Sequence, residues 1–203
     1  MKKFLIAMTA AAILFAPSEK VFADVSVPEN IFKWVLSTAR GNYFFNQQQA
    51  GYYVRPDNTI DLNILIVPTI CTYDEVQIED VVQKRRWNML STDGYGDLVG
   101  RADYLKFNLE AGTVQVIERV DLDHTFSPLD NDKSGSPVAL SSFAENDINC
   151  RFYRAILSWA KEHHDTLVAR SRGKLREADK KIKSEHLPIA QIPLPGVKKA
   201  VKE

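Results

Sequence analysis

The sequence lacks the motifs by which many enzymes are recognised. It contains no G-x-S-x-G elbow, no Walker A loop, no complete G-x-G-x-x-G fingerprint and no C-x-x-C pair. The adjacent His163 and His164 do not form a metal-binding pair, because neighbouring helix residues point roughly 100° apart. The sequence therefore indicates no catalytic constellation, and no cofactor is expected.

An excess of charge of either sign is also lacking. The chain has 26 basic and 26 acidic residues, and without residues 1–23 it has 23 basic and 25 acidic ones, a net charge of −2. Proteins that bind nucleic acids through their phosphates usually carry a strong positive balance. Nucleic acid is therefore not an expected partner.

Long apolar runs are confined to the start of the chain. Two lysines precede the apolar residues 4–16, and the small residues Val21 and Ala23 follow. This order is typical of a secretory signal peptide that spans residues 1–23, with an N-terminal membrane anchor as the alternative. No later segment approaches 18 apolar residues, so the mature chain is expected to have no transmembrane segment. We therefore expect an exported protein of the periplasm or the cell surface.

Cysteine is scarce as well. The chain contains only Cys71 and Cys150. In an oxidising compartment an even number of cysteines allows a disulfide, whereas buried free thiols behave as small hydrophobic side chains. The sequence leaves both alternatives open for this pair.

The strongest structural signal is a strand over residues 59–73, TIDLNILIVPTICTY. Ile64 and Ile66 lie in one phase of the strand, and Leu65 and Val67 lie in the other. Because strand side chains alternate between two faces, the pattern indicates a central strand that becomes covered on both sides. We expect the neighbouring segments to pair with this strand or to cover it.

Shorter strands are expected before and after it. A turn at Arg55-Pro56-Asp57-Asn58 leads into the central strand, and Gly112 marks the turn of a later hairpin. Residues 129–137 are expected to form a polar connection. The further strand segments are residues 31–37, 43–45 with 52–54, and both arms of the hairpin over 102–120.

Residues 75–90 fit either a helix or a strand. Asp74 is a good N-cap with Gln77 three positions later, and apolar residues recur at helical spacing after it. Val76, Ile78 and Val82 also share a period of two, which suits a strand. The capping pair favours the helix.

A long helix over residues 142–170 is predicted to close the fold. It has an apolar stripe with Trp159 at its middle, and Ser142 or Asp147 as its cap. The predicted fold is thus α+β: an antiparallel sheet of about five strands covered by a long C-terminal helix. The single domain spans residues 31–170, between a flexible lead-in at 24–30 and a basic helical extension with a disordered, proline-containing tail at 171–203.

Two segments have side chains that suit ligands. Lys84, Arg85, Arg86 and Trp87 place three cations beside an indole, which favours contact with an anionic polymer, unless they form a solvated helix face. The second segment, Asp130, Asp132, Ser134 and Gly135, matches the first half of a calcium-binding loop. Its twelfth position is a serine instead of the bidentate glutamate, so a polar turn is the favoured interpretation.

The order of features resembles the surface-adhesin protein E-like family of exported bacterial proteins. The resemblance implies an antiparallel sheet with a packed helix, and some members bind host matrix or plasma proteins. The chain departs from the family in its 73–87 segment, its longer C-terminal helix and the placement of its cysteines. The resemblance covers residues 31–159 and rests on Trp34, Tyr43, Phe44, Phe45, residues 62–69, Tyr104, Phe107, Gly112, Phe152 and Trp159.

Two functions follow from these patterns. The first is a non-enzymatic, adhesin-like binding module of the cell envelope or surface, whose partner is a host or envelope macromolecule. The sequence does not decide whether the protein forms a homodimer. The second is a small periplasmic hydrolase that uses carboxylates of its loops. Two converging carboxylates with a perturbed pKa would favour the enzyme. The residues concerned are Asp93, Asp97, Asp121 and Asp123.

Overall fold

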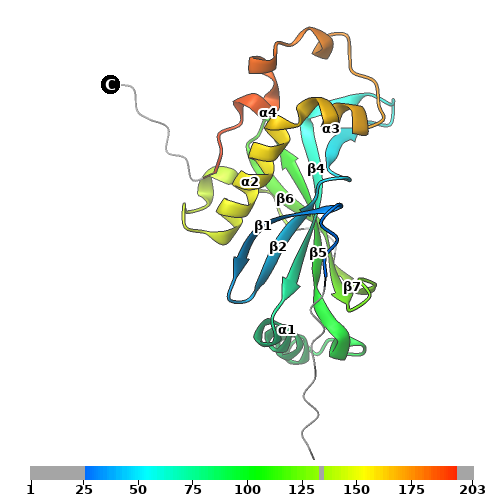
Figure 1. The fold of residues 1–203 in the computed structure, drawn as a ribbon, viewed down its shortest axis with the longest axis vertical. Helices are drawn as coiled ribbons and strands as arrows, with labels where there is room; N and C mark the ends of the chain where they lie inside the picture. The colour runs from blue at the N-terminus through cyan, green and yellow to red at the C-terminus, as the bar shows by residue number, and fades with distance from the viewer. Residues whose placement is uncertain (1–25, 133–134, 196–203) are drawn as a thin grey trace, which may run out of the picture.

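A large antiparallel sheet dominates the structure (Figure 1). The computed structural model describes residues 26–132 and 135–195, so the expected signal peptide lies outside the described residues. The strands are β1 (Phe32–Thr38), β2 (Gly41–Asn46), β3 (Gly51–Val54), β4 (Ile60–Tyr73), β5 (Leu98–Asn108), β6 (Thr113–Asp123), β7 (Pro128–Asp132) and β8 (Val138–Ala139).

The central strand of the prediction is also central in the sheet. The strand order is β1-β2-β4-β5-β6-β7, while β3 pairs with β4 and β8 pairs with β6. At the end of β4, Gly41 on one neighbouring strand and Gly100 on the other leave room for its backbone. A Cβ atom at either glycine would overlap the carbonyl oxygen of Thr72 or Cys71. Both glycines are thus required for close strand pairing.

The two faces of the sheet are covered differently. Leu65 and Val67 of β4 belong to the main core, which lies on the side of α2 (Ile148–Glu162). Ile70 points to the other face, where it meets Val120 and Leu122 in a small second cluster. Because the residues alternate along the strand, β4 is apolar on both faces, as its sequence predicts.

Helix α2 packs on the sheet through its apolar stripe (Figure 1). Trp159 is only 7% exposed, which confirms its predicted burial. Its ring lies 5.0 Å from the ring of Phe45, and the imidazole of His163 stacks on it at 4.7 Å. The helix is capped by Asp147, whose side chain accepts a hydrogen bond from Asn149 N.

The prediction of about five strands under a long C-terminal helix is wrong. Within residues 26–132 and 135–195 the sheet has eight strands, and the helix ends at Glu162, where His163 leaves helical geometry and α3 (His164–Arg170) begins. Strand β7 was missed because its sequence, PLDND, has the composition of a turn. Its backbone bonds to β6 decide its conformation instead.

The C-terminal segment also differs from the prediction. Residues 171–195 do not continue the helix but form short turns, two 3-10 helices (Asp179–Lys181 and Ser184–His186) and α4 (Pro188–Gln191). Leu187, Ile189 and Ile192 are buried in the main core. This segment is therefore part of the domain as far as residue 195, and the rest of the predicted tail lies outside the described residues.

Residues 75–90 contain a helix, α1 (Glu75–Trp87). Asp74 caps it by accepting a hydrogen bond from Gln77 N at 2.7 Å, which confirms the predicted cap. None of its residues is buried, so α1 lies on the outside of the sheet at the lower end of the molecule in Figure 1. Among the described residues no helix is long and apolar enough to span a membrane.

Candidate functional site

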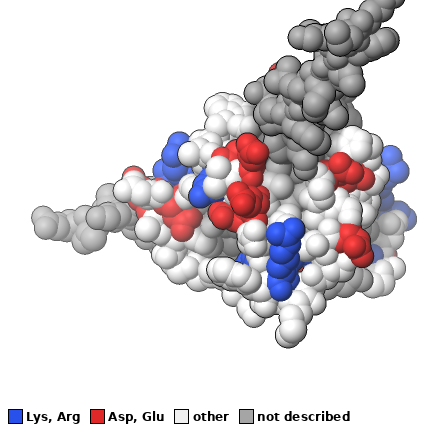
Figure 2. All heavy atoms as spheres, turned by 90° about the horizontal axis from the view of Figure 1, so that it is seen from below, with Lys and Arg blue, Asp and Glu red and all other residues white. Residues whose placement is uncertain are grey.

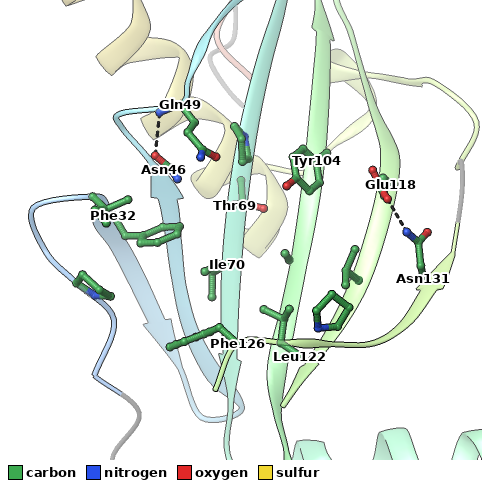
Figure 3. A pocket seen from close by; sticks show the side chains of 16 residues that line it. Phe32, Asn46, Gln49, Thr69, Ile70, Tyr104, Glu118, Leu122, Phe126 and Asn131 are labelled. Carbon is green, nitrogen blue, oxygen red and sulfur yellow. Dashed lines mark hydrogen bonds between the residues drawn. The ribbon is translucent and has the colours of Figure 1, made fainter. Parts of the chain in front are cut away.

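The sheet face opposite α2 forms an open trough (Figure 3). Its volume is about 570 Å³. Strands β1, β2, β4, β5, β6 and β7 all contribute side chains to it, and Pro28 and Ile31 border it before β1 begins. A large sheet with a helix on only one face leaves such a surface free, and the strong twist of antiparallel strands makes it concave.

One end of the trough is apolar. Ile70, Val120 and Leu122 are buried at its floor, with Ala102 beside them. Phe32 of β1 and Phe126, in the turn between β6 and β7, border this floor, and Phe126 lies below Ile70 in Figure 3. An apolar ligand chain placed here would exchange water for contacts with carbon on several sides.

The other end is polar. Asn46 is almost fully buried, and its Oδ1 accepts hydrogen bonds from the backbone N–H groups of Gln48 and Gln49. These two bonds fix the amide so that its Nδ2 donor is directed away from them. Across the trough, Asn131 Nδ2 donates to Glu118 Oε1, and Tyr104 lies between the two pairs (Figure 3).

One acidic side chain dominates the charge of the trough lining. Of the 16 described residues that line the trough, Glu118 is the only charged one, and none of them is a lysine or an arginine. A ligand head that donates hydrogen bonds or carries positive charge would be stabilised at this end, whereas an anionic head would meet the carboxylate.

Phe126 covers the apolar end in a strained conformation. Its φ is 60°, in the left-handed region that bulky residues rarely adopt. The turn is held by Asp123, whose Oδ1 accepts hydrogen bonds from the backbone N–H groups of Thr125 and Ser127. The Thr125 hydroxyl also donates to this oxygen. Its bond is the largest cause, ahead of the backbone bonds, of a pKa of the Asp123 carboxyl below its usual range. Strain that is held in place by such bonds is typical of functional positions.

The predicted binding residues Lys84, Arg85, Arg86 and Trp87 lie outside the trough, on the last turns of α1. Lys84, Arg86 and Trp87 are exposed, whereas the Arg85 side chain is only 14% exposed and points into the molecule. The four residues therefore do not form one surface.

Arg85 attaches α1 to the sheet. Its Nη1 lies 2.7 Å from Asp130 Oδ2, its Nε donates to Ser91 O, and its guanidinium lies over the ring of Tyr95 at 4.2 Å. The bond from Arg85 lowers the pKa of the Asp130 carboxyl. Burial, together with the hydrogen bond to Asp121, raises the pKa of Tyr95. Arg85 is thus a structural residue.

The loop carboxylates do not assemble a catalytic pair. Asp121 accepts a hydrogen bond from the Tyr95 hydroxyl, Asp123 accepts bonds within its own turn, and Asp93 accepts a hydrogen bond from the Ser91 hydroxyl. The lowered pKa of Asp123 favours its ionised form, which does not act as a general acid at neutral pH. The observation that would favour a hydrolase is therefore not found in the described part of the chain.

The first residues of the calcium-loop pattern lie on a strand. Asp130 and Asp132 belong to β7, whose extended backbone does not wrap around a cation, and Asp130 already binds Arg85. Ser134 lies outside the described residues. Within the described ranges, no group of three or more His, Cys, Asp or Glu side chains could hold a metal ion.

Cys71 and Cys150 are both buried and are not bonded to each other. Cys71 lines a small cavity of about 20 Å³ between the sheet and the first turn of α2, together with Asn149 and Phe152. Burial raises the pKa of its thiol to about 11. Arg154 Nη2 lies 3.6 Å from the sulfur of Cys150, one turn away on the same helix.

Comparison with family models, with curated proteins and with solved structures finds no match for this chain. The resemblance to the surface-adhesin family therefore stays a prediction. The trough itself was not predicted from the sequence. The sequence feature that pointed to it is the second set of alternating apolar residues in β4, which ends at Ile70. This set indicated that the second face of the strand is covered, but not by which residues.

Proposed function

We propose that the protein is an exported, non-enzymatic binding module that holds an amphiphilic ligand in the trough. The observation that supports this most is the open trough of about 570 Å³, apolar at one end and polar at the other. Its volume lies within the range of roughly 300–1,000 Å³ that is common for small-molecule sites. A group of the same chemistry presented by a host or envelope macromolecule would use the same surface.

The lining defines the ligand further. The apolar end around Ile70 and Leu122 suits an alkyl or aromatic group. The polar end offers the Glu118 carboxylate, which suits a head that donates hydrogen bonds or carries positive charge. The Asn46 Nδ2 donor suits an acceptor atom on the same head, because Oδ1 already accepts two backbone bonds. The ligand class is therefore a neutral or cationic amphiphile.

Two probes with the same tail and opposite head charge test this assignment. Decylamine and decanoate are titrated calorimetrically below their aggregation concentrations. Decylamine is expected to bind at least roughly tenfold more tightly. Glu118→Gln should remove this preference, and Glu145→Gln, an exposed position outside the trough, should keep it. Equal affinity for both probes in the unmodified protein would contradict the assignment.

A second pair of variants tests the role of Phe126. Phe126→Gly removes the side chain over the trough and also relieves the left-handed strain. It should weaken decylamine binding without lowering the melting temperature. Asn58→Gly relieves the same kind of strain at φ 65°, outside the trough, and should leave binding unchanged. Unchanged binding in Phe126→Gly would remove this residue from the site.

Export is tested separately. The N-terminal pattern predicts that mass spectrometry of the protein recovered from the cell envelope finds Asp24 as the first residue. An intact Met1 on membrane-bound protein would exclude this part of the proposal and leave the ligand site unaffected.

A further inference from the structure

The C-terminal end of α1 exposes a cluster of large apolar side chains. Trp87 is 84% exposed, Met89 is 93% exposed and Leu90 is 51% exposed. We name these three residues, with the neighbouring Lys84 and Arg86, the α1 tip. Single exposed apolar residues are ordinary on a protein surface, but three large ones within four positions are unusual, and such a concentration of exposed apolar side chains suggests an interaction surface.

The backbone of the α1 tip is strained where the patch is most exposed. The helix ends in a Schellman motif, in which Met89 N donates to Arg86 O and Leu90 N donates to Arg85 O. The residue after the cap in this motif takes a left-handed conformation and is usually glycine. Here it is Met89, with φ 55°. The chain thus holds a long apolar side chain in solvent at a position that favours glycine.

The α1 tip is also held rigidly. Arg85, which lies inside it in sequence, is bound to Asp130 of β7 and donates to Ser91 O just after the exposed residues. Arg85 therefore connects both ends of the turn to β7, while Trp87 and Met89 stay in solvent. A rigid apolar projection loses little conformational entropy when it binds.

The charged side chains around these residues differ in whether they form ion pairs. Among the described residues Arg85 is paired with Asp130, and Asp80 is paired with Arg40, whereas Lys84 and Arg86 form no ion pair. Figure 2 shows this end of the molecule, where acidic side chains gather over part of the face and basic side chains lie beside them. Two unpaired cations beside the apolar cluster are thus a local feature of the α1 tip.

We propose that the α1 tip is a membrane-contact site that inserts Trp87 and Met89 among the headgroups of an anionic lipid bilayer. Indole and apolar side chains favour the boundary between headgroups and acyl chains, and adjacent lysine and arginine side chains bind anionic headgroups. The inference does not rest on the trough. If both hold, β7 connects them, because Asp130 binds the α1 tip while Pro128 and Asn131 line the trough.

The test is sedimentation with vesicles of phosphatidylcholine alone or mixed with phosphatidylglycerol. The protein used begins at Asp24, the start expected after processing, so that the apolar residues 4–16 do not contribute. Binding is expected to the mixed vesicles, to weaken with salt, and to shift the emission of Trp87 to the blue.

Variants separate the role of the α1 tip from the stability of the fold. Met89→Gly should raise the melting temperature and still reduce vesicle binding at least about fivefold, because it relieves strain and removes the apolar group. The double variant Lys84→Gln, Arg86→Gln should lose the preference for anionic vesicles. Trp34→Ala removes a tryptophan that is 57% exposed on β1 and should bind as the unmodified protein does.

Three results would overturn the proposal. The first is absence of binding to either kind of vesicle. The second is an equal loss of binding in Trp34→Ala and Trp87→Ala. The third is self-association of the protein alone that Trp87→Ala or Met89→Gly abolishes, which would assign the α1 tip to contact with a second copy of the chain.

Discussion

Arg85 Nη1 lies 2.7 Å from Asp130 Oδ2, and this ion pair joins α1 to the edge strand β7. The sequence indicated a ligand-binding role for each residue separately, Arg85 in a basic run and Asp130 in a calcium-loop pattern, and gave no sign that the two pair with each other. The pair matters because it connects two exposed features. The α1 tip lies on one side of it, and the wall of the trough that contains Pro128 and Asn131 lies on the other.

Replacing Arg85 by leucine is expected to destabilise the protein by about 1–3 kcal/mol, since hydrogen bonds to charged groups contribute that much and the partner carboxylate is left unpaired. Urea denaturation followed by circular dichroism measures the change. The neighbouring Arg86→Leu is the matched control, because Arg86 is exposed and unpaired among the described residues. Equal effects of the two substitutions would contradict the anchoring role of Arg85.

Trp159→Ala is expected to lower the free energy of unfolding by about 3–5 kcal/mol, because it leaves a large cavity beside Phe45 in the main core. Trp87→Ala, at a position that is 84% exposed, should change stability by less than about 0.5 kcal/mol. A loss below about 1 kcal/mol for Trp159→Ala would mean that α2 does not pack on the sheet through this residue.

Stability is expected to fall as the pH is lowered from 7.5 to 5.5, values that bracket the unperturbed histidine pKa of about 6.5. His164 Nδ1 lies 2.7 Å from the hydroxyl of Tyr52, and burial lowers the pKa of its imidazole, although the charge of Asp165 opposes this. The folded state therefore binds fewer protons than the unfolded state. The stability that neutral His164 contributes is complete above the pKa of the unfolded state, and it is lost as the pH falls through the lower pKa of the folded state.

Melting temperatures measured across this range test the effect. The slope should be smaller in His164→Gln, which does not titrate, and unchanged in His186→Gln, since His186 is exposed on a short turn. The same slope in wild type and His164→Gln would show that other groups dominate the pH dependence.

Cys71 and Cys150 should react slowly with a thiol reagent in the native protein at pH 8. Both are buried, and the thiol pKa of Cys71 is raised to about 11, so little thiolate forms. After denaturation without reductant, both thiols should react. Protein from the cell envelope that shows no reactive thiol under these conditions would instead contain the disulfide that the sequence leaves open.

The sequence by itself determined the elements whose signals are local. The alternating apolar residues over 59–73 correspond to β4, the Asp74–Gln77 pair caps α1, and the stripe around Trp159 faces the core. Each depends on the side-chain period or on a hydrogen bond between near neighbours, so the residues concerned lie next to one another in the chain.

Only the tertiary structure decided where the helix breaks, how many strands the sheet has and what lies on its second face. Strand β7 exists because β6 offers it backbone partners, although its own residues favour a turn. The trough brings Phe32, Asn46, Glu118 and Phe126 together from four separate segments, and Arg85 turns inward because Asp130 and Tyr95 lie there. Such arrangements depend on pairing between distant segments, and the period of a single strand or helix does not specify its partner.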